Sequence, residues 1–512
     1  MSNNWEFYGR ESELADIERI ISSDRWFFCS ISGRRRIGKT TLIKQVLQNL
    51  DRPFFYFQVP DSDERGVVQA FWEAWEDTFD SGIGAEAVEK FDIPELVKTF
   101  QDMVFLTRLM NIAGWIVIID EFQYFHRKQL SPFTSYLQKA VDELRANEYE
   151  WDDEERPMGG IFVLGSIHTE MTAVLEDRAS PLFGRLTDTV SLEHWDFSTL
   201  FEMFDEHNVE EPEHWLFLWS LFEGVPKFYR DCFDQGVLSL KDDYRQTTLL
   251  KLFFEGSSPL KDEAENWFLR ELRGRYDSVL KLLANNGPSA SSELRSEYER
   301  TGAERELSAY LAVLTDRYQM VEKQQPIFSG ERSRKTRYAI TDNFLTAWMR
   351  AIRRNLQMAK VQPIDRPLAR ADEALKTHEG FAFEKMTRLL TQESSRKGVG
   401  DFALTDFVHG YWNKADGSDI EIDLVALNED EPCVRFGSCK RSASAHDGAA
   451  LQVFDEHVDR FLQTKEGRRL TDWRVEKVLY SPIFDEQQKQ FYEAKGYLTR
   501  DLQFFRDRLY PV

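Results

Sequence analysis

The chain has 512 residues, of which 42% are hydrophobic, and a formal net charge of −23 at pH 7. This length predicts two to four domains with real hydrophobic cores. No run of 18 apolar residues occurs, which argues against a membrane-spanning helix, and the acidic balance repels nucleic acid on average. Any contact with DNA therefore requires a local basic patch.

The N-terminus and the cysteines indicate the compartment. Residues Met1 to Trp5 lack the charged and apolar blocks of a signal peptide. The four cysteines, at positions 29, 232, 433 and 439, have neither metal-ligand spacing nor the arrangement of a disulfide framework. We therefore expect a cytoplasmic protein.

The first predicted domain spans residues 1–205. Predicted strands alternate with helices, the strands lying at 26–32, 53–59, 115–120, 160–166 and roughly 188–193. This alternation predicts an α/β fold with a parallel sheet that helices cover on both faces. An acidic stretch at 143–158 is predicted to be a solvated loop.

A phosphate-binding loop lies between the first strand and the next helix. The pattern G-x-x-x-x-G-K-T predicts nucleoside triphosphate binding by Gly33, Arg34, Arg35, Arg36, Ile37, Gly38, Lys39, Thr40 and Thr41. The two glycines allow a tight turn whose N–H groups, with the helix N-terminus, face an anion. Lys39 would reach the β- and γ-phosphates, and the Thr40 hydroxyl would be a ligand of Mg²⁺. ATP and Mg²⁺ are the predicted cofactors.

The run Trp115 to Ile119 is typical of a strand buried on both faces, and it ends in Asp120 and Glu121. At the carboxyl end of such a strand, Asp120 would lie beside the metal and Glu121 would polarise an attacking water. The alternative is a buried strand that meets a solvated acidic turn, which the adjacent loop motif disfavours. The pair therefore favours hydrolysis over transfer to a second substrate.

The remaining chain changes character several times. Residues 206–260 are helical and aromatic and predict a helical lid. Residues 261–345 predict three helices followed by a hairpin, the layout of a winged helix, with Arg337 to Ile340 as a wing strand. The alternative use of this domain is packing or partner contact, because the expected recognition helix carries Glu304 and Glu306. Residues 346–375 are predicted as a linker helix plus a turn, and 376–512 as a last α/β domain.

Several motifs together resemble a known assemblage. They include Tyr8-Gly9-Arg10-Glu11, the GRRRIGKTT loop, the Asp120-Glu121 strand end and Leu182-Phe183-Gly184-Arg185. The combination resembles archaeal-type ATPases of the AAA+/STAND group, which often end in a domain similar to PD-(D/E)xK nucleases. The resemblance implies that Ser166 senses the γ-phosphate. It implies for Arg185 a role in cis, a role as a finger on a neighbouring subunit, or a salt bridge, and these stay open.

The tail looks like such a nuclease domain, with a restriction-endonuclease-like fold. The resemblance implies that Glu384 is the helix acid, Asp423 the strand acid and Lys440 the lysine, with the two carboxylates holding the metal. Ser438 stands where the pattern has glutamate, so one carboxylate is missing. Glu421 could replace it, since it lies two residues before Asp423 on the same side of the strand. So could Asp455 or Glu456, and a degenerate domain that only binds is the alternative.

The sequence thus predicts an ATP-hydrolysing switch or motor that acts on DNA and carries a nuclease-like tail. The alternative is a STAND-like signalling or assembly ATPase in which nucleotide controls formation of a homo-oligomer. Action on DNA requires a contiguous basic surface near Lys440, Arg441 and the pair Arg353-Arg354. The signalling alternative predicts that the protein assembles in an ATP-dependent way and that DNA does not stimulate it.

Overall fold

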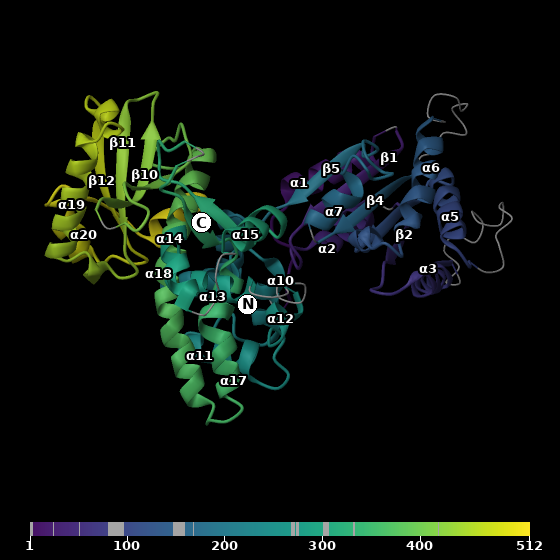
Figure 1. Ribbon diagram of the computed structural model, residues 1–512, viewed down its shortest axis with the longest axis horizontal. Helices are drawn as coiled ribbons and strands as arrows, with labels where there is room; N and C mark the ends of the chain where they lie inside the picture. Colours follow the sequence, from purple (N-terminus) through teal and green to yellow (C-terminus); the bar gives the residue numbers. More distant parts are fainter. Residues whose placement is uncertain are drawn as a thin grey trace. The chain divides into compact units, whose positions relative to one another are not determined.

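The computed structural model describes residues 4–23, 25–50, 52–79, 97–146, 159–166, 168–267, 272, 276–300, 307–330, 333–417 and 419–511. The chain forms two compact units (Figure 1). The first is Gly9–His194, and the second joins the residues up to Tyr8 with those from Trp195 onwards. Each unit has its own sheets and core.

The first unit is built on a five-stranded sheet in which all neighbouring strands are parallel. Its strand order is β2-β3-β4-β1-β5. The strands are β1 (Phe27–Gly33), β2 (Phe54–Gln58), β3 (Ile116–Asp120), β4 (Gly160–Gly165) and β5 (Asp188–Leu192). The predicted parallel sheet is confirmed, and all five strands lie where the apolar runs place them.

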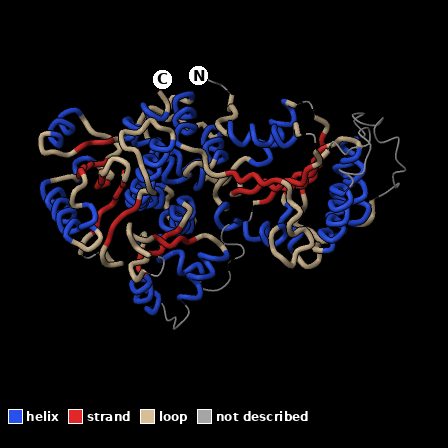
Figure 2. Tube along the Cα trace, turned by 90° about the horizontal axis from the view of Figure 1, so that it is seen from above, coloured by secondary structure: helices blue, strands red, loops and turns tan. Residues whose placement is uncertain are grey.

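Helices cover both faces of this sheet (Figure 2). Alternate residues of a strand point to opposite faces of the sheet, so one apolar strand contributes side chains to the cores on both faces. One face packs against α1 (Glu11–Ile21) and α2 (Lys39–Asn49). The other packs against α3 (Glu64–Phe79), α5 (Phe100–Ile112), η1 (Phe122–His126), α6 (Pro132–Ala146) and α7 (His168–Leu175). Most of the acidic stretch 143–158 lies outside the described residues.

The second unit begins with short helices rich in aromatic residues. They are α8 (Phe197–Glu206), α9 (Pro212–Phe222), α10 (Pro226–Asp234), α11 (Tyr244–Leu249), the π-helical turn η3 (Leu250–Phe254) and α12 (Glu263–Trp267). Phe222 contacts Phe228 in a tilted arrangement and Tyr229 edge-to-face, inside a common core. Most of these helices lie within residues 206–260, where the sequence predicts helical structure, and their use as a lid stays a prediction.

Helices and a small antiparallel sheet follow. The elements are α13 (Tyr276–Asn286), β6 (Ser289–Ala290), α14 (Ser291–Arg300), α15 (Leu307–Ala312), η4 (Val313–Arg317), β7 (Val321–Gln324) and β8 (Arg337–Ile340). The sheet has the order β6-β8-β7, and β8 is the strand expected from Arg337 to Ile340. Glu304 and Glu306, which weighed against a recognition helix, lie outside the described residues.

The segment 346–375, predicted as a linker helix plus a turn, is mostly helical in the structure. It contains the end of α16 (Asn343–Ala347), η5 (Trp348–Ile352), α17 (Arg353–Met358) and the start of α18 (Asp365–Arg396). Pro367 is the third residue of α18, in the first turn, where proline costs no intrahelical hydrogen bond. Leu368, Ala371 and Leu375 are buried in the core that contains the lid. One continuous helix therefore connects the supposed linker with the tail domain.

The tail has a mixed five-stranded sheet in the order β13-β12-β11-β10-β9. The strands are β9 (His409–Trp412), β10 (Glu421–Asn428), β11 (Cys433–Cys439), β12 (Arg474–Tyr480) and β13 (Leu498–Arg500). The pairs from β9 to β11 are antiparallel, and those from β11 to β13 are parallel. One face of the sheet packs on α18 and α21 (Leu502–Leu509), and the other packs on α19 (Gly448–Gln463) and α20 (Glu486–Glu493). Two short 3-10 helices, η6 (Ala443–Ala445) and η7 (Gly467–Leu470), lie in the connection from β11 to β12.

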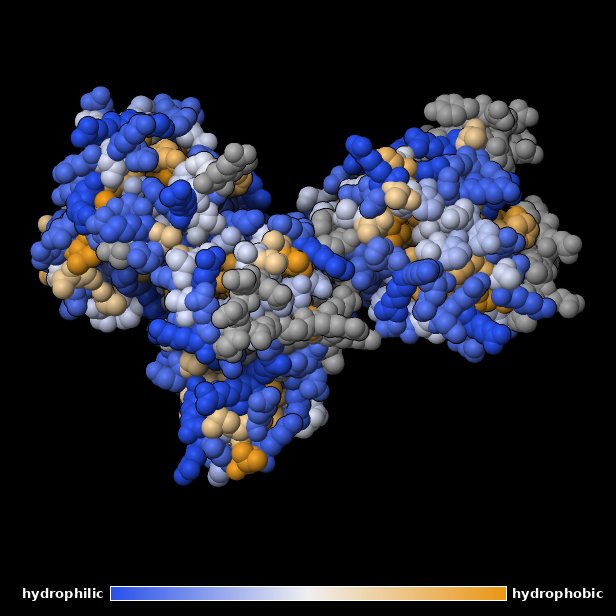
Figure 3. Space-filling view, in the orientation of Figure 1, coloured by the Kyte–Doolittle hydropathy of each residue, from blue (hydrophilic) through white to orange (hydrophobic). Residues whose placement is uncertain are grey.

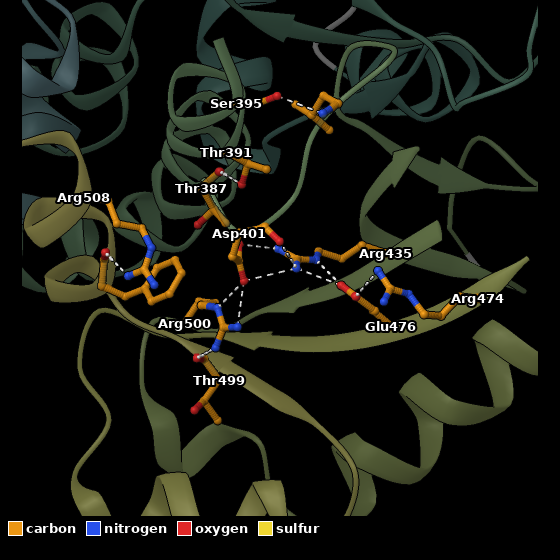
Figure 4. A network of polar contacts seen from close by, with 12 residues as sticks. Thr387, Thr391, Ser395, Asp401, Arg435, Arg474, Glu476, Thr499, Arg500 and Arg508 are labelled. Atoms are coloured by element: carbon orange, nitrogen blue, oxygen red, sulfur yellow. Dashed lines mark hydrogen bonds and ion pairs between the residues drawn. The ribbon is translucent and has the colours of Figure 1, made fainter. Parts of the chain in front are cut away.

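A buried ion network holds three strands of the tail together (Figure 4). The Arg435 side chain on β11 is 3% exposed and bonds Asp401 at 2.8 Å and Glu476 of β12 at 2.8 Å. Arg500 of β13 contacts the same Asp401 carboxylate at 2.7 Å. Each carboxylate thus has a charged partner, as burial of charge requires.

The surface seen in Figure 3 is mainly hydrophilic, with scattered apolar patches. Among the described residues, no helix has the length and apolar character needed to cross a membrane.

Candidate nucleotide-binding site

The phosphate loop adopts the backbone conformation that its sequence predicts. Three of its residues have positive φ: Gly33 at 151°, Arg36 at 65° and Gly38 at 98°. A Cβ at Gly33 would lie 2.6 Å from the carbonyl oxygen of Leu192, so only glycine fits there. Helix α2 begins at Lys39 with Gly38 as its N-cap, and no side chain caps it. Its first N–H groups therefore suit an anion.

Lys39 lies at the centre of the loop. Its ammonium donates to the carbonyl oxygens of Gly33 at 3.0 Å and Arg34 at 3.1 Å, and to Ser166 Oγ at 2.9 Å. Burial lowers the pKa of Lys39 to about 8, against the opposing effect of the nearby Asp120 and Glu121 carboxylates. The structure thus brings the predicted Ser166, just after β4, into contact with the predicted Lys39.

The two predicted metal ligands of this site are also in contact. Thr40 Oγ1 donates to Asp120 Oδ2 at 2.6 Å, and the Glu121 backbone N–H donates to Asp120 Oδ1 at 2.8 Å. A hydroxyl and a carboxylate side by side next to the loop are the oxygen ligands that Mg²⁺ takes in nucleotide sites. The residues therefore fit a nucleotide with its Mg²⁺.

Glu121 is held in place by a residue whose role the sequence did not predict. Its φ is 55°, which is uncommon for a residue with a side chain. The Gln123 amide, on η1, donates through Nε2 to Glu121 Oε2. Gln123 is 1% exposed, and its Oε1 has no hydrogen-bond partner among the described residues. The amide thus fixes the orientation of the carboxylate that would polarise water.

Arg10, which precedes α1, contacts the phosphate loop and the residue after β5. Its guanidinium donates to the carbonyl oxygen of Glu193 at 2.6 Å and of Ile37 at 3.4 Å, and pairs with Glu13 at 2.8 Å. It thereby ties the start of α1 to the end of β5 and to the phosphate loop. The Gly9-Arg10-Glu11 motif marked the position, although its structural role was not apparent from the sequence.

Arg185 pairs within its own unit. Its Nε and Nη2 donate to the two carboxylate oxygens of Asp142, on α6, at 2.8 and 2.9 Å. This is the salt bridge among the three roles that the sequence left open, and a bidentate pair is its strongest form. The hydrogen bonds of Arg185 within the described residues go to the Asp142 carboxylate and to the Phe183 carbonyl.

The three tail residues also come together. Lys440 Nζ lies 3.8 Å from Asp423 Oδ2, which accepts from the Cys439 N–H at 2.8 Å. Arg388 connects the two acids, at 3.5 Å from Glu384 and 3.1 Å from the Asp423 carbonyl oxygen. Burial, together with the negative charge of Asp423, raises the pKa of Glu384 to about 8. Arg388 is a member that the sequence pattern did not indicate.

The residues that could replace the missing tail carboxylate have other partners. Glu421 pairs with Arg337 at 2.6 Å, Asp455 with Lys477 at 2.8 Å, and Glu456 accepts from Gln452 at 2.9 Å. Ser438 is buried on β11. Within the part of the chain that the structure describes, no group of three or more His, Cys, Asp or Glu residues is arranged to hold a metal. The tail cluster therefore consists of the Glu384 and Asp423 carboxylates with the cations Arg388 and Lys440.

Comparisons with known proteins agree with the first site. Residues 7–228 match a family model described as an ATPase domain predominantly from Archaea, and residues 348–451 match one described as "Archaea bacterial proteins of unknown function". An uncharacterized protein of Methanocaldococcus jannaschii is 24% identical over 442 residues, covering 85% of this chain and 87% of that protein.

Solved structures with detectable similarity include two archaeal proteins. A Walker-type ATPase of Pyrococcus abyssi has 19% identity, a TM-score of 0.49, and coverage of 68% of this chain and 100% of its own. The ORC2 protein of Aeropyrum pernix, in its ADPNP–ADP complexes, has 14% identity, a TM-score of 0.46, and coverage of 73% and 95%. Residues 7–228, which contain the phosphate loop, are thus similar to an archaeal type of ATPase domain, and residues 348–451 are similar to a domain family of unknown function.

Proposed function

We propose that this protein is an ATP-hydrolysing molecular switch that depends on Mg²⁺. The observation that carries the proposal is the convergence of Lys39, Thr40, Asp120 and Ser166 at the carboxyl ends of β1, β3 and β4. Ligands of parallel α/β sheets bind at these strand ends. Four polar side chains from three segments meet there, as a bound triphosphate would require.

Each residue has a role in this proposal. The loop N–H groups and Lys39 would hold the phosphates, and Thr40 and Asp120 would hold the Mg²⁺, which supplies charge neutralisation when bound. Ser166, bonded to Lys39, would report on the terminal phosphate. Glu121, oriented by Gln123, would accept the proton of the attacking water.

Two variants test the assignment. Lys39→Ala should abolish nucleotide binding, whereas Glu121→Gln should bind ATP with wild-type affinity and lose hydrolysis, because the metal ligand stays while the base is removed. Glu176→Gln, an exposed change in the same unit, is the matched control. Wild-type turnover in purified Glu121→Gln would refute the role of Glu121 as the base.

The helix α18 offers a route from the lid to the tail within the second unit. Its His378 bonds the Ser220 carbonyl of α9 at 2.7 Å, and its Glu393 accepts from the N–H groups of Phe197 and Ser198 at 2.7 and 3.0 Å. Lys385, on the same helix, donates to the Thr341 carbonyl at 2.8 Å. We propose that the lid, the helices with the small sheet, and the tail move as one body when the nucleotide changes.

A second candidate activity is metal-dependent DNA cleavage by the tail. The specific observation in its favour is the convergence of Glu384, Asp423 and Lys440, which come from a helix and two adjacent strands. With one carboxylate missing, Mn²⁺ is the better test metal, since Mg²⁺ demands near-ideal octahedral geometry. Asp423→Ala should stop cleavage while ATP turnover continues, and Asp430→Ala on an exposed loop is the control.

The absence of cleavage by the wild type and by Ser438→Glu, with either metal, would instead favour a binding module. Two of the arginines expected to form a basic surface for DNA are paired with glutamates. Arg441 pairs with Glu379 at 2.6 Å, and Arg353 pairs with Glu265 at 2.6 Å. DNA stimulation of turnover, and ATP-dependent assembly measured by light scattering, distinguish action on DNA from the signalling alternative.

A further inference from the structure

Tyr56 connects the edge strand β2 with the Asp120 carboxylate. β2 lies at one end of the sheet beside β3, and its Tyr56 is paired in register with Ile118, two residues before Asp120. The Tyr56 hydroxyl donates to Asp120 Oδ2 at 2.8 Å. No linear motif contains Tyr56, so its role could not be predicted from the sequence.

The contact matters because of what else bonds the same oxygen. Asp120 Oδ2 accepts from both Thr40 and Tyr56, while Oδ1 accepts from the Glu121 N–H. A carboxylate oxygen offers about two lone-pair directions, so both directions on Oδ2 are used. When the Thr40 hydroxyl turns its lone pairs to a metal ion, Tyr56 is the side-chain donor that remains on Oδ2. Tyr56 then orients the carboxylate through Oδ2, and the Glu121 N–H orients it through Oδ1.

The ring of Tyr56 is held independently of its hydroxyl. The Lys44 ammonium, on α2, lies 4.3 Å from the ring centroid. The ring also packs against the apolar cluster under α1 and α2. Lys44 is one helical turn beyond Thr40, so the ring lies between the helix that carries one metal ligand and the strand that carries the other. Removal of the hydroxyl should therefore leave the ring in place.

We propose that Tyr56 is a positioning residue for Mg²⁺, acting through Asp120. This inference rests on the proposed ATP·Mg²⁺ site and adds a residue to it. Partners that orient a metal-ligating carboxylate typically contribute about 10- to 100-fold in metal affinity. Because Tyr56 contacts Asp120 and Thr40, the two side chains that would hold the metal, its effect should be confined to binding that depends on the metal.

The test compares nucleotide affinity with and without metal. Binding of a fluorescent ADP analogue is titrated in EDTA, and MgCl₂ is then titrated at fixed nucleotide. Tyr56→Phe should keep the metal-free affinity and raise the half-saturating MgCl₂ concentration by roughly 10-fold. Tyr136→Phe, an exposed tyrosine on α6, should change neither. Unchanged half-saturation in Tyr56→Phe, with nucleotide still bound, would overturn this inference alone, whereas a wild type that binds no nucleotide would overturn the proposed function as well.

A double-variant cycle separates positioning from general stability. If Tyr56 acts through Asp120, then Tyr56→Phe should have no further effect on half-saturation in an Asp120→Asn background. A merely structural role would instead lower the metal-free affinity and the melting temperature in both backgrounds. Additive losses in the cycle would therefore overturn the inference, even where Tyr56→Phe alone weakens binding.

Discussion

A buried histidine on α18 should make the stability of the second unit depend on pH. His378 is 3% exposed, and its Nε2 donates to the Ser220 carbonyl oxygen at 2.7 Å. Its Nδ1 has no hydrogen-bond partner among the described residues. Burial lowers the pKa of His378 from 6.5 to about 4, because a buried imidazolium would lose its hydration.

The direction of the effect follows from this pKa. Between 6.5 and about 4, the unfolded chain binds a proton that the folded chain does not, so the folded state loses stability as pH falls through this window. Above the window the histidine is neutral in both states and has no effect. For these two pKa values, the loss between roughly pH 8 and pH 5 is about 2 kcal/mol.

The assay is urea unfolding followed by tryptophan fluorescence at both pH values. His378→Gln is the informative variant, since its amide can still donate to the Ser220 carbonyl but does not titrate. The wild type should lose about 2 kcal/mol more than the variant on acidification. The same pH dependence in both proteins would refute the assignment of a buried neutral His378, and with it this contact between α18 and α9.

Three further changes test other parts of the structure. If Arg185 acts as an arginine finger, Arg185→Ala should lower ATP turnover by roughly 10³-fold. Asp142→Asn, which weakens the salt bridge but keeps the guanidinium, should not lower it. Wild-type turnover in Arg185→Ala would leave the salt bridge with Asp142 as the role of Arg185. Gly33→Ala should prevent binding of the fluorescent ADP analogue, because the added Cβ would lie 2.6 Å from the Leu192 carbonyl oxygen. Arg435→Met should cost roughly 3 kcal/mol in the urea transition of the second unit, with ATP turnover retained.

The sequence predicted the parts of the site that are contiguous in the chain. The phosphate loop is one segment, and Asp120 directly follows an apolar run, so a linear pattern contains both. Tyr56 was not predicted, because its contact with Asp120 spans 64 residues and depends on the strand order. Arg10 contacts the carbonyl oxygen of Glu193, 183 residues away, and only the closed sheet brings these two together.

In the second unit the extent of the elements was harder to predict. The sequence predicts a linker helix and a turn over 346–375 and a separate helix around Phe381–Leu390, whereas α18 runs without a break from Asp365 to Arg396, with Pro367 in its first turn. Strands β9 and β13 have only four and three residues, too few for a visible alternation. Glu384, Asp423 and Lys440 were predicted from the resemblance to nucleases with a helix acid, a strand acid and a lysine, and the structure brings these side chains near one another, although their role stays a prediction.

Neighbouring residues of α18 connect the lid with the tail site. Lys385 pairs with Glu223, which has a positive φ of 49° and precedes the Gly224-Val225-Pro226 break, whereas the adjacent Glu384 belongs to the tail cluster. Because α18 is a continuous helix, these two side chains share one rigid backbone segment. A rearrangement of the turn at Glu223 would therefore act on the residue next to Glu384 without any mobile linker between them. The turn at Glu223 and the tail cluster are therefore connected within the second unit by one uninterrupted helix.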